Sequence, residues 1–225
     1  MGYYTYKSCG YMDIKNTQRG VTLVEMIVVV AIFAVVASIL FFKYSDFNTS
    51  VSVRNLSQEV ALTVRKAQTY ATSVRSLNGV SAVSDQFPAY GVSFSPDAPG
   101  ATYAPSYKQF TVFADMVNGA DINRYYDRGS DCGNPSINNE CVELYSINTS
   151  DKVVQLCTDY PVSDTCISSG TVNVIFRRPA PDAEICIVSG SQCTTTVSYV
   201  KVVLESIKGT QKTVTIWNTG QISGQ

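Results

Sequence analysis

The sequence predicts an α+β protein in which a long N-terminal helix packs on an antiparallel β-sheet or small β-sandwich. The helix is expected to be transmembrane in its first half and amphipathic in its second. Three observations support this. The apolar run from Val21 to Phe42 has Glu25 as its only charge. No Pro or Gly interrupts the chain from Val21 to Leu77. After Pro88, short segments that alternate apolar and polar residues are separated by turn residues.

Residues 1–20 form a leader that precedes the apolar run. Lys7, Lys15 and Arg19 outweigh Asp13 in this leader. The positive-inside rule therefore places the leader on the cytoplasmic side, and the domain after the apolar run on the other side of the membrane.

The first part of the predicted helix, residues 21–42, would be about 33 Å long, which is enough to cross a hydrocarbon core of about 30 Å. A charged side chain inside such a segment costs roughly 2.5–3.5 kcal/mol on insertion scales, so Glu25 is a functional residue by default and needs a partner. The second part, to residue 77, carries an apolar stripe at spacings of three and four: Leu56, Val60, Val64, Ala67, Ala71 and Val74. The opposite face carries Arg54, Gln58, Arg65, Gln68 and Arg75.

A β-rich domain is expected after the helix. Asn78-Gly79 is a helix stop signal, and residues 78–88 are a predicted linker into a domain of residues 89–225. Lys208-Gly209 predicts a tight turn between the last two strands. Short strands between turns favour an antiparallel sheet or sandwich. The predicted strands are residues 90–94, 109–113, 142–147, 152–157, 171–177, 184–188, 198–206 and 211–218.

Composition argues against a catalytic or nucleic-acid-binding role. The chain has no histidine, which removes the commonest general base and the Ser-His and Cys-His nucleophile pairs. No other catalytic constellation is visible, so the chain is not predicted to be an enzyme. The net charge of −1 gives no argument for a nucleic-acid partner, and the charged content of 16% is typical of an exported domain.

Six cysteines remain once the leader, with Cys9, is set apart. An even number in an exported domain predicts a disulfide framework, and free thiols are the alternative. Six cysteines allow fifteen connectivities. Their grouping into near pairs favours Cys132–Cys141, Cys157–Cys166 and Cys186–Cys193. None of these pairs has the two- to four-residue spacing of a zinc site.

One segment of the predicted domain is rich in oxygen side chains, and calcium is its candidate ligand. The segment contributes Asp115, Asn118, Asp121, Asn123 and Asp127. Calcium binds six to eight oxygens, which closely spaced Asp and Asn around a turn supply. The pattern is not an EF-hand, because no bidentate Glu closes the loop. A polar surface turn is the alternative interpretation.

The N-terminal pattern resembles the class III signal of type IV prepilins and pseudopilins. It consists of Gly20, then Val21-Thr22-Leu23-Val24-Glu25, then an apolar helix, all behind a basic leader. The resemblance implies cleavage between Gly20 and Val21 by a prepilin peptidase, and methylation of the new amine on Val21. It also implies that Glu25 pairs with the N-terminal ammonium of a neighbouring subunit during assembly.

The C-terminal strands, Tyr199 to Glu205 and Thr213 to Ser223, resemble the closing hairpin of H-type pseudopilins, a group that includes minor pilins that prime filaments or bind DNA. The resemblance implies a minor pilin or pseudopilin of a type IV pilus or type II secretion pseudopilus. Its partners would be prepilin peptidase, other pilin subunits and the membrane. It would cross the cytoplasmic membrane once, with its domain outside, and enter an extracellular filament after assembly. Arg177-Arg178 and the helix arginines are candidate DNA contacts, or simply solvated side chains.

Two other interpretations remain open. The apolar run could be an ordinary secretory signal with Val35-Val36-Ala37 as a small-residue cleavage site, which would give a mature start at Ser38. It could also be a plain anchor for an extracytoplasmic binding domain that does not polymerise.

Overall fold

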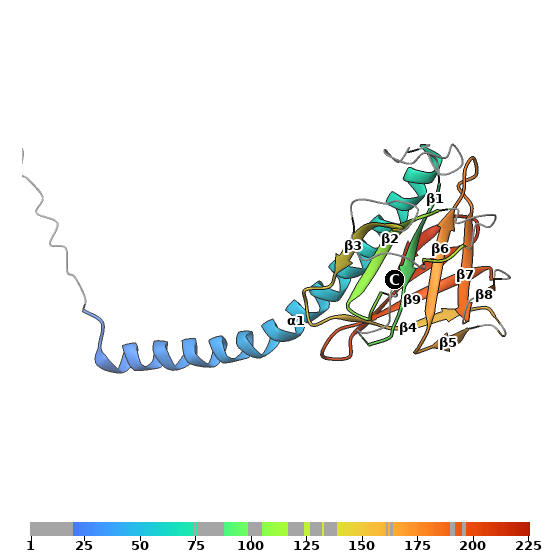
Figure 1. Ribbon diagram of the computed structural model, residues 1–225. Helices are drawn as coiled ribbons and strands as arrows, with labels where there is room; N and C mark the ends of the chain where they lie inside the picture. The colour runs from blue at the N-terminus through green and yellow to red at the C-terminus, as the bar shows by residue number, and fades with distance from the viewer. Residues whose placement is uncertain are drawn as a thin grey trace, which may run out of the picture. The chain divides into compact units, whose positions relative to one another are not determined.

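The chain divides into two compact units, residues 1–44 and residues 45–225 (Figure 1). A computed structural model describes residues 20–73, 75, 88–98, 105–116, 124–126, 132, 139–160, 162, 164–189, 192–194 and 197–225. Of the predicted linker, residues 78–88, only residue 88 is among the described residues.

One helix, α1 (Leu23–Thr72), contributes residues to both units. Its length follows from the absence of Pro and Gly between Val21 and Leu77. The prediction of one uninterrupted helix that begins at the apolar run and continues into the amphipathic stripe is confirmed.

The helix ends at Thr72 rather than at the predicted Leu77. The backbone N–H of Arg75 donates to the carbonyl of Tyr70 at 3.2 Å. This bond spans five residues, whereas each bond of a regular α-helix spans four. The Thr72 hydroxyl donates to the carbonyl of Gln68 at 2.9 Å. Such hydroxyl–carbonyl bonds compete with the helical ladder, so the polar end of the segment closes the helix before its sequence stop signal.

Two antiparallel sheets make up the rest of the second unit (Figure 1). The six-stranded sheet has the order β3-β2-β1-β6-β7-β8, and the five-stranded sheet has the order β11-β10-β9-β4-β5. The strands of the first are β1 (Ala89–Phe94), β2 (Gln109–Asp115), β3 (Cys141–Ser146), β6 (Thr171–Phe176), β7 (Ala183–Ser189) and β8 (Gln192–Thr194). The strands of the second are β4 (Lys152–Thr158), β5 (Thr165–Ile167), β9 (Tyr199–Glu205), β10 (Gln211–Trp217) and β11 (Ile222–Gly224).

Each strand predicted from the sequence is present, with ends that differ slightly from the prediction. The short strands β5, β8 and β11 were not predicted. The turn between β9 and β10 contains Gly209 in the left-handed region (φ 79°), and its N–H donates to the carbonyl of Ser206 at 2.9 Å. The predicted turn at Lys208-Gly209 is therefore confirmed.

The amphipathic half of α1 shares one hydrophobic core with both sheets. Val60 and Val64 are fully buried, as are Val92 and Val174 of the six-stranded sheet and Leu204 of the five-stranded sheet. Full burial of one such side chain contributes roughly 1.5–3 kcal/mol. The predicted stripe is confirmed at Leu56, Val60, Val64, Ala67 and Ala71; Val53 extends it, and Val74 lies outside the described residues.

An ion pair ties α1 to β3, the edge strand of the six-stranded sheet. Lys66 Nζ lies 2.6 Å from both carboxylate oxygens of Glu143 and donates to the Tyr145 hydroxyl at 3.1 Å. Tyr145 in turn donates to Glu143 Oε2, and its ring stacks on Phe110 with centroids 5.1 Å apart. Burial disfavours both charges, but these bonds outweigh it, so the pKa of Lys66 is raised and the pKa of Glu143 is lowered.

The Lys66–Glu143 pair predicts a loss of stability in acid. Because the pKa of Glu143 is lowered in the folded state, its contribution is complete above its ordinary value of 4.5 and is lost as the pH falls through the folded value. The raised pKa of Lys66 keeps its contribution complete below its ordinary value of 10.5. Both side chains are more than a third exposed, at 35% and 38%. We therefore expect only about 0.5–1 kcal/mol after solvent screening.

The measurement is the difference in unfolding free energy between the full chain and its Glu143→Gln variant. This difference should be present at neutral pH and should be lost as the pH falls below 4.5 and through the lowered folded pKa of Glu143. Lys152→Met, which removes the looser Lys152–Glu205 pair (3.6 Å), is the matched control. A difference that stays constant from neutral pH into acid would contradict the prediction.

A second junction joins α1 to both sheets. Gln68 Nε2 donates to the carbonyls of Pro181, at 2.8 Å, and Gly220, at 3.3 Å. The N–H of Ala183, at the start of β7, donates to the carbonyl of Asn218 after β10 at 2.8 Å. The Gln68 side chain is therefore the point where α1 meets the segment before β7 and the β10–β11 turn.

Candidate functional site

The start of α1 is fixed by a capping arrangement that includes Glu25. The Glu25 N–H donates to Thr22 Oγ1 at 3.2 Å, and the Met26 N–H donates to the Thr22 carbonyl at 3.2 Å. Thr22 is therefore the N-cap, and Thr22-Leu23-Val24-Glu25 has the Thr-x-x-Glu pattern of a capping box. The carboxylate of Glu25 lies in the first helical turn, where the helix dipole favours negative charge.

Gly20 and Val21 lie directly before this cap, and both are exposed and outside the helix. An exposed, non-helical peptide bond is a good protease substrate. Cleavage between them would create a new amine one residue before the N-cap and one helical turn before Glu25. The basic residues of the leader lie outside the described residues.

The first half of α1 is long and apolar enough to cross a membrane, and it is the one such helix in the described part of the chain. Its large apolar side chains are exposed in their own unit, among them Leu23 at 75% and Phe41 at 78%. A continuous apolar surface of this kind needs lipid or other helices to cover it. This fits a membrane-anchored protein.

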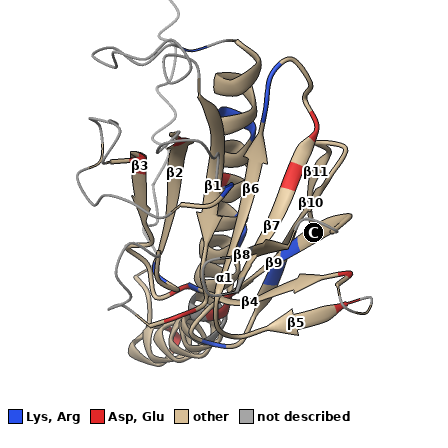
Figure 2. Ribbon diagram, turned by 45° about the vertical axis from the view of Figure 1, so that its right-hand side comes forward, with Lys and Arg blue, Asp and Glu red and all other residues tan. Residues whose placement is uncertain are grey.

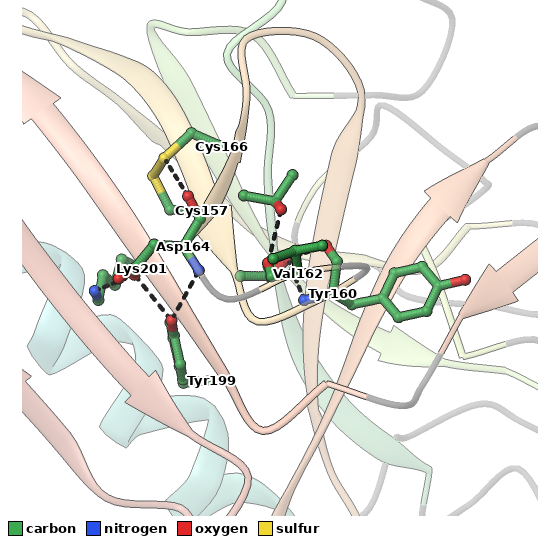
Figure 3. The surroundings of a disulfide bond; sticks show 9 residues. Cys157, Tyr160, Val162, Asp164, Cys166, Tyr199 and Lys201 are labelled. Carbon is green, nitrogen blue, oxygen red and sulfur yellow. Dashed lines mark hydrogen bonds and ion pairs between the residues drawn. A yellow bond between two sulfur atoms is a disulfide. The ribbon is translucent and has the colours of Figure 1, made fainter.

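The three predicted disulfides are all present: Cys132–Cys141, Cys157–Cys166 and Cys186–Cys193. Cys157 and Cys166 face each other directly across the β4–β5 pair. Figure 3 shows that Asp164, next to this bond, lies beside Tyr199 and Lys201 of β9. Tyr199 donates to Asp164 Oδ1 at 2.8 Å, and Lys201 forms an ion pair with the same oxygen.

The calcium site stays a prediction. Asp115 is 2% exposed at the end of β2. The other four candidate ligands, Asn118, Asp121, Asn123 and Asp127, lie outside the described residues. Among the residues that the structure describes, there is no cluster of three or more His, Cys, Asp or Glu side chains that could hold a metal ion.

Two of the candidate DNA contacts, Arg177 and Arg178, lie in the connection between β6 and β7, and the helix arginines lie on α1 or directly after it. Figure 2 shows basic residues where the chain leaves β6 and acidic residues where it enters β7. Glu184 Oε2 lies 3.1 Å from Arg124 Nε and 3.9 Å from Arg177 Nη2. Because one carboxylate is shared by two arginines, part of their charge is already neutralised. DNA binding by Arg177 and Arg178 also stays a prediction.

Residues 15–41 match the family model of the prokaryotic N-terminal methylation motif. The matched region includes Gly20, Val21 and Glu25 together with most of the apolar run. No curated protein and no solved structure matches the chain.

Proposed function

The chain carries a type IV pilin-like precursor signal, and from this premise we propose that it is a minor pilin or pseudopilin. It would be a structural subunit of a type IV pilus or of a type II secretion pseudopilus. A prepilin peptidase cleaves between Gly20 and Val21, and the amine of Val21 is then methylated. The observation that carries the proposal is the match of residues 15–41 to the methylation motif.

Before assembly, the helix half from Val21 to Phe42 holds the subunit in the cytoplasmic membrane with its domain outside. During assembly this half moves from lipid into the filament core, where the helices of other subunits cover its apolar surface. A carboxylate in such a core is costly unless it is paired. The ammonium on Val21 of a neighbouring subunit supplies the partner of Glu25. A subunit that is displaced along the filament leaves both charges unpaired. The pair therefore also favours the correct position of each subunit relative to its neighbour.

The test is the mass of the N-terminal peptide of the protein purified from its native membrane. A start at Val21 with one added methyl group is the expected result. A start at Ser38 would make this an ordinary secreted protein, and an intact leader would leave only a membrane anchor. Recovery of the processed chain in filaments sheared from cells tests the second half of the proposal. A processed chain that never leaves the membrane would contradict it.

A further inference from the structure

A trough runs along one flank of α1, between the helix and the end of β3. It consists of two hollows of about 350 Å³ and 240 Å³ that share Asn55 and Glu59 in their linings. Leu62 and Tyr145 line the first hollow, and Asn148 lines the second. We call this surface the trough.

The trough has an acidic centre and an apolar wall. Lys66 lines it, but its charge is neutralised by the two-oxygen contact with Glu143. Glu59 forms no ion pair with any residue that the structure describes. Leu62 is 66% exposed beside it. An apolar wall next to a carboxylate suits a side chain with an aliphatic stem and a cationic head, such as arginine.

The other flank of α1 is basic. Arg54 and Lys212 line a third hollow of about 390 Å³, which borders the trough at Gln58. Arg65 lies on the same side of the helix as Arg54, since the interval between them is close to three helical turns. We call Arg54, Arg65 and Lys212 the basic flank. Within the described part of the chain, none of the three takes part in an ion pair.

From these two surfaces we propose that the basic flank of one copy docks into the trough of a second copy, with Arg54 against Glu59. The inference rests on the proposed function, in the case that adjacent filament subunits are copies of this chain, and it names the contact between them. A second copy fits the trough by charge complementarity, because the trough presents the carboxylate of Glu59 and the basic flank presents three cations. Since the two surfaces are different, the contact is head-to-tail. A contact of this type repeats without closing and produces a helical filament.

The test is a charge swap in the full chain, expressed in its native host, with filaments recovered by shearing. Glu59→Arg and Arg54→Glu should each lower the amount of chain in filaments by about tenfold, because each variant sets like charges against one another. The double variant, Glu59→Arg with Arg54→Glu, should restore incorporation because the pair is re-formed with reversed signs. Asp182→Lys is an equal charge change at an exposed residue that lines none of the three hollows, and it should have no effect.

A crosslinking experiment tests the contact directly. Two differently tagged copies, one with Glu59→Cys and one with Arg54→Cys, should form a mixed disulfide when filaments are oxidised. The pair of Ile207→Cys with Arg54→Cys is the matched control, because Ile207 is 76% exposed in the β9–β10 turn and belongs to neither surface. This control should give no mixed disulfide.

The outcomes separate this inference from the proposed function. If the wild-type chain enters filaments and both single variants enter equally well, the docking model is overturned and the proposed function stands. The docking model would also be overturned if the double variant did not regain incorporation into filaments. The same holds if the Glu59→Cys chain crosslinked only to a different protein. If the wild-type chain neither enters filaments nor crosslinks to a second copy, both are wrong.

Discussion

Replacing Glu25 with Ala should leave cleavage after Gly20 intact and remove most of the chain from filaments. In the proposed function, the peptidase acts on the bond between Gly20 and Val21, which lies outside the helix. Assembly, as proposed, needs a partner for the Val21 ammonium in an apolar surrounding. A charge-assisted hydrogen bond contributes roughly 1.5–3 kcal/mol, so its loss should lower incorporation by about tenfold to a hundredfold.

The measurement is the ratio of chain in sheared filaments to chain in membranes, with the N-terminal mass recorded for both fractions. Thr22→Val is the matched control, because it removes the hydroxyl that caps α1 and keeps the carboxylate. Loss of the cap alone costs about 1 kcal/mol of helix stability. Wild-type incorporation of the Glu25→Ala chain would contradict the assigned role. Equal defects in the two variants would assign the effect to capping rather than to pairing.

Among the glycines that the structure describes, Gly220 should be the one whose replacement with Ala is most destabilising. Gly220 has φ 78°, in the left-handed region, and its N–H donates to the carbonyl of Trp217 at 2.9 Å. A Cβ atom there would overlap the carbonyl oxygen of Pro181 and approach Gln68 Nε2 to 2.7 Å. Strain at such a backbone conformation costs roughly 1–3 kcal/mol, and overpacking costs a further 1–3 kcal/mol. We expect a loss of about 3 kcal/mol or more.

Gly209→Ala separates the two costs. Gly209 has almost the same backbone conformation, with φ 79°, but nothing lies within 4 Å of the added Cβ. It should therefore lose only about 1 kcal/mol, from backbone strain. In a chain of this size, each kcal/mol lowers the thermal midpoint by about 2–4 °C, so thermal unfolding in detergent should resolve the variants. Equal midpoints would show that the junction at Gln68 tolerates the methyl group.

The sequence was sufficient to predict those elements of the structure that one local pattern of residues determines. The stripe from Leu56 to Ala71 keeps a 3.6-residue period over several turns, and its residues are buried as expected. Strand β1 was found for a similar reason, because Tyr90 to Phe94 alternates large apolar residues with Gly and Ser. The close spacing of the cysteines, such as Cys186 and Cys193, likewise anticipated the disulfides.

Features that depend on distant partners were not predictable. Strands β5 and β8 are three residues long, too short for a period of two to be recognised, and they exist through pairing with β4 and β7. The strand order also depends on long-range pairs, such as β1 with β6 and β4 with β9. No local pattern specifies which strands become neighbours.

At the N-terminus, the sequence predicted roles for Gly20, Val21 and Glu25, which stay predictions, but the capping role of Thr22 was missed. The signal was visible, since Thr22 and Glu25 have the spacing of a capping box before an apolar run. The trough and the basic flank could not have been found in this way. Glu59 and Tyr145 come from distant parts of the chain and line one hollow only because α1 lies beside β3.

The placement of the disulfides determines how the protein would respond to mechanical load. Cys157–Cys166 and Cys186–Cys193 each join neighbouring strands of one sheet, and Cys132–Cys141 joins a turn to the start of β3. Because α1 contains no cysteine, no covalent bridge fastens the helix to the β-strands. If a subunit is pulled through its helix, the force must pass through apolar packing and contacts such as Lys66–Glu143. Reduction of the disulfides should therefore increase how far the strands extend after rupture, while the force that detaches α1 should stay the same.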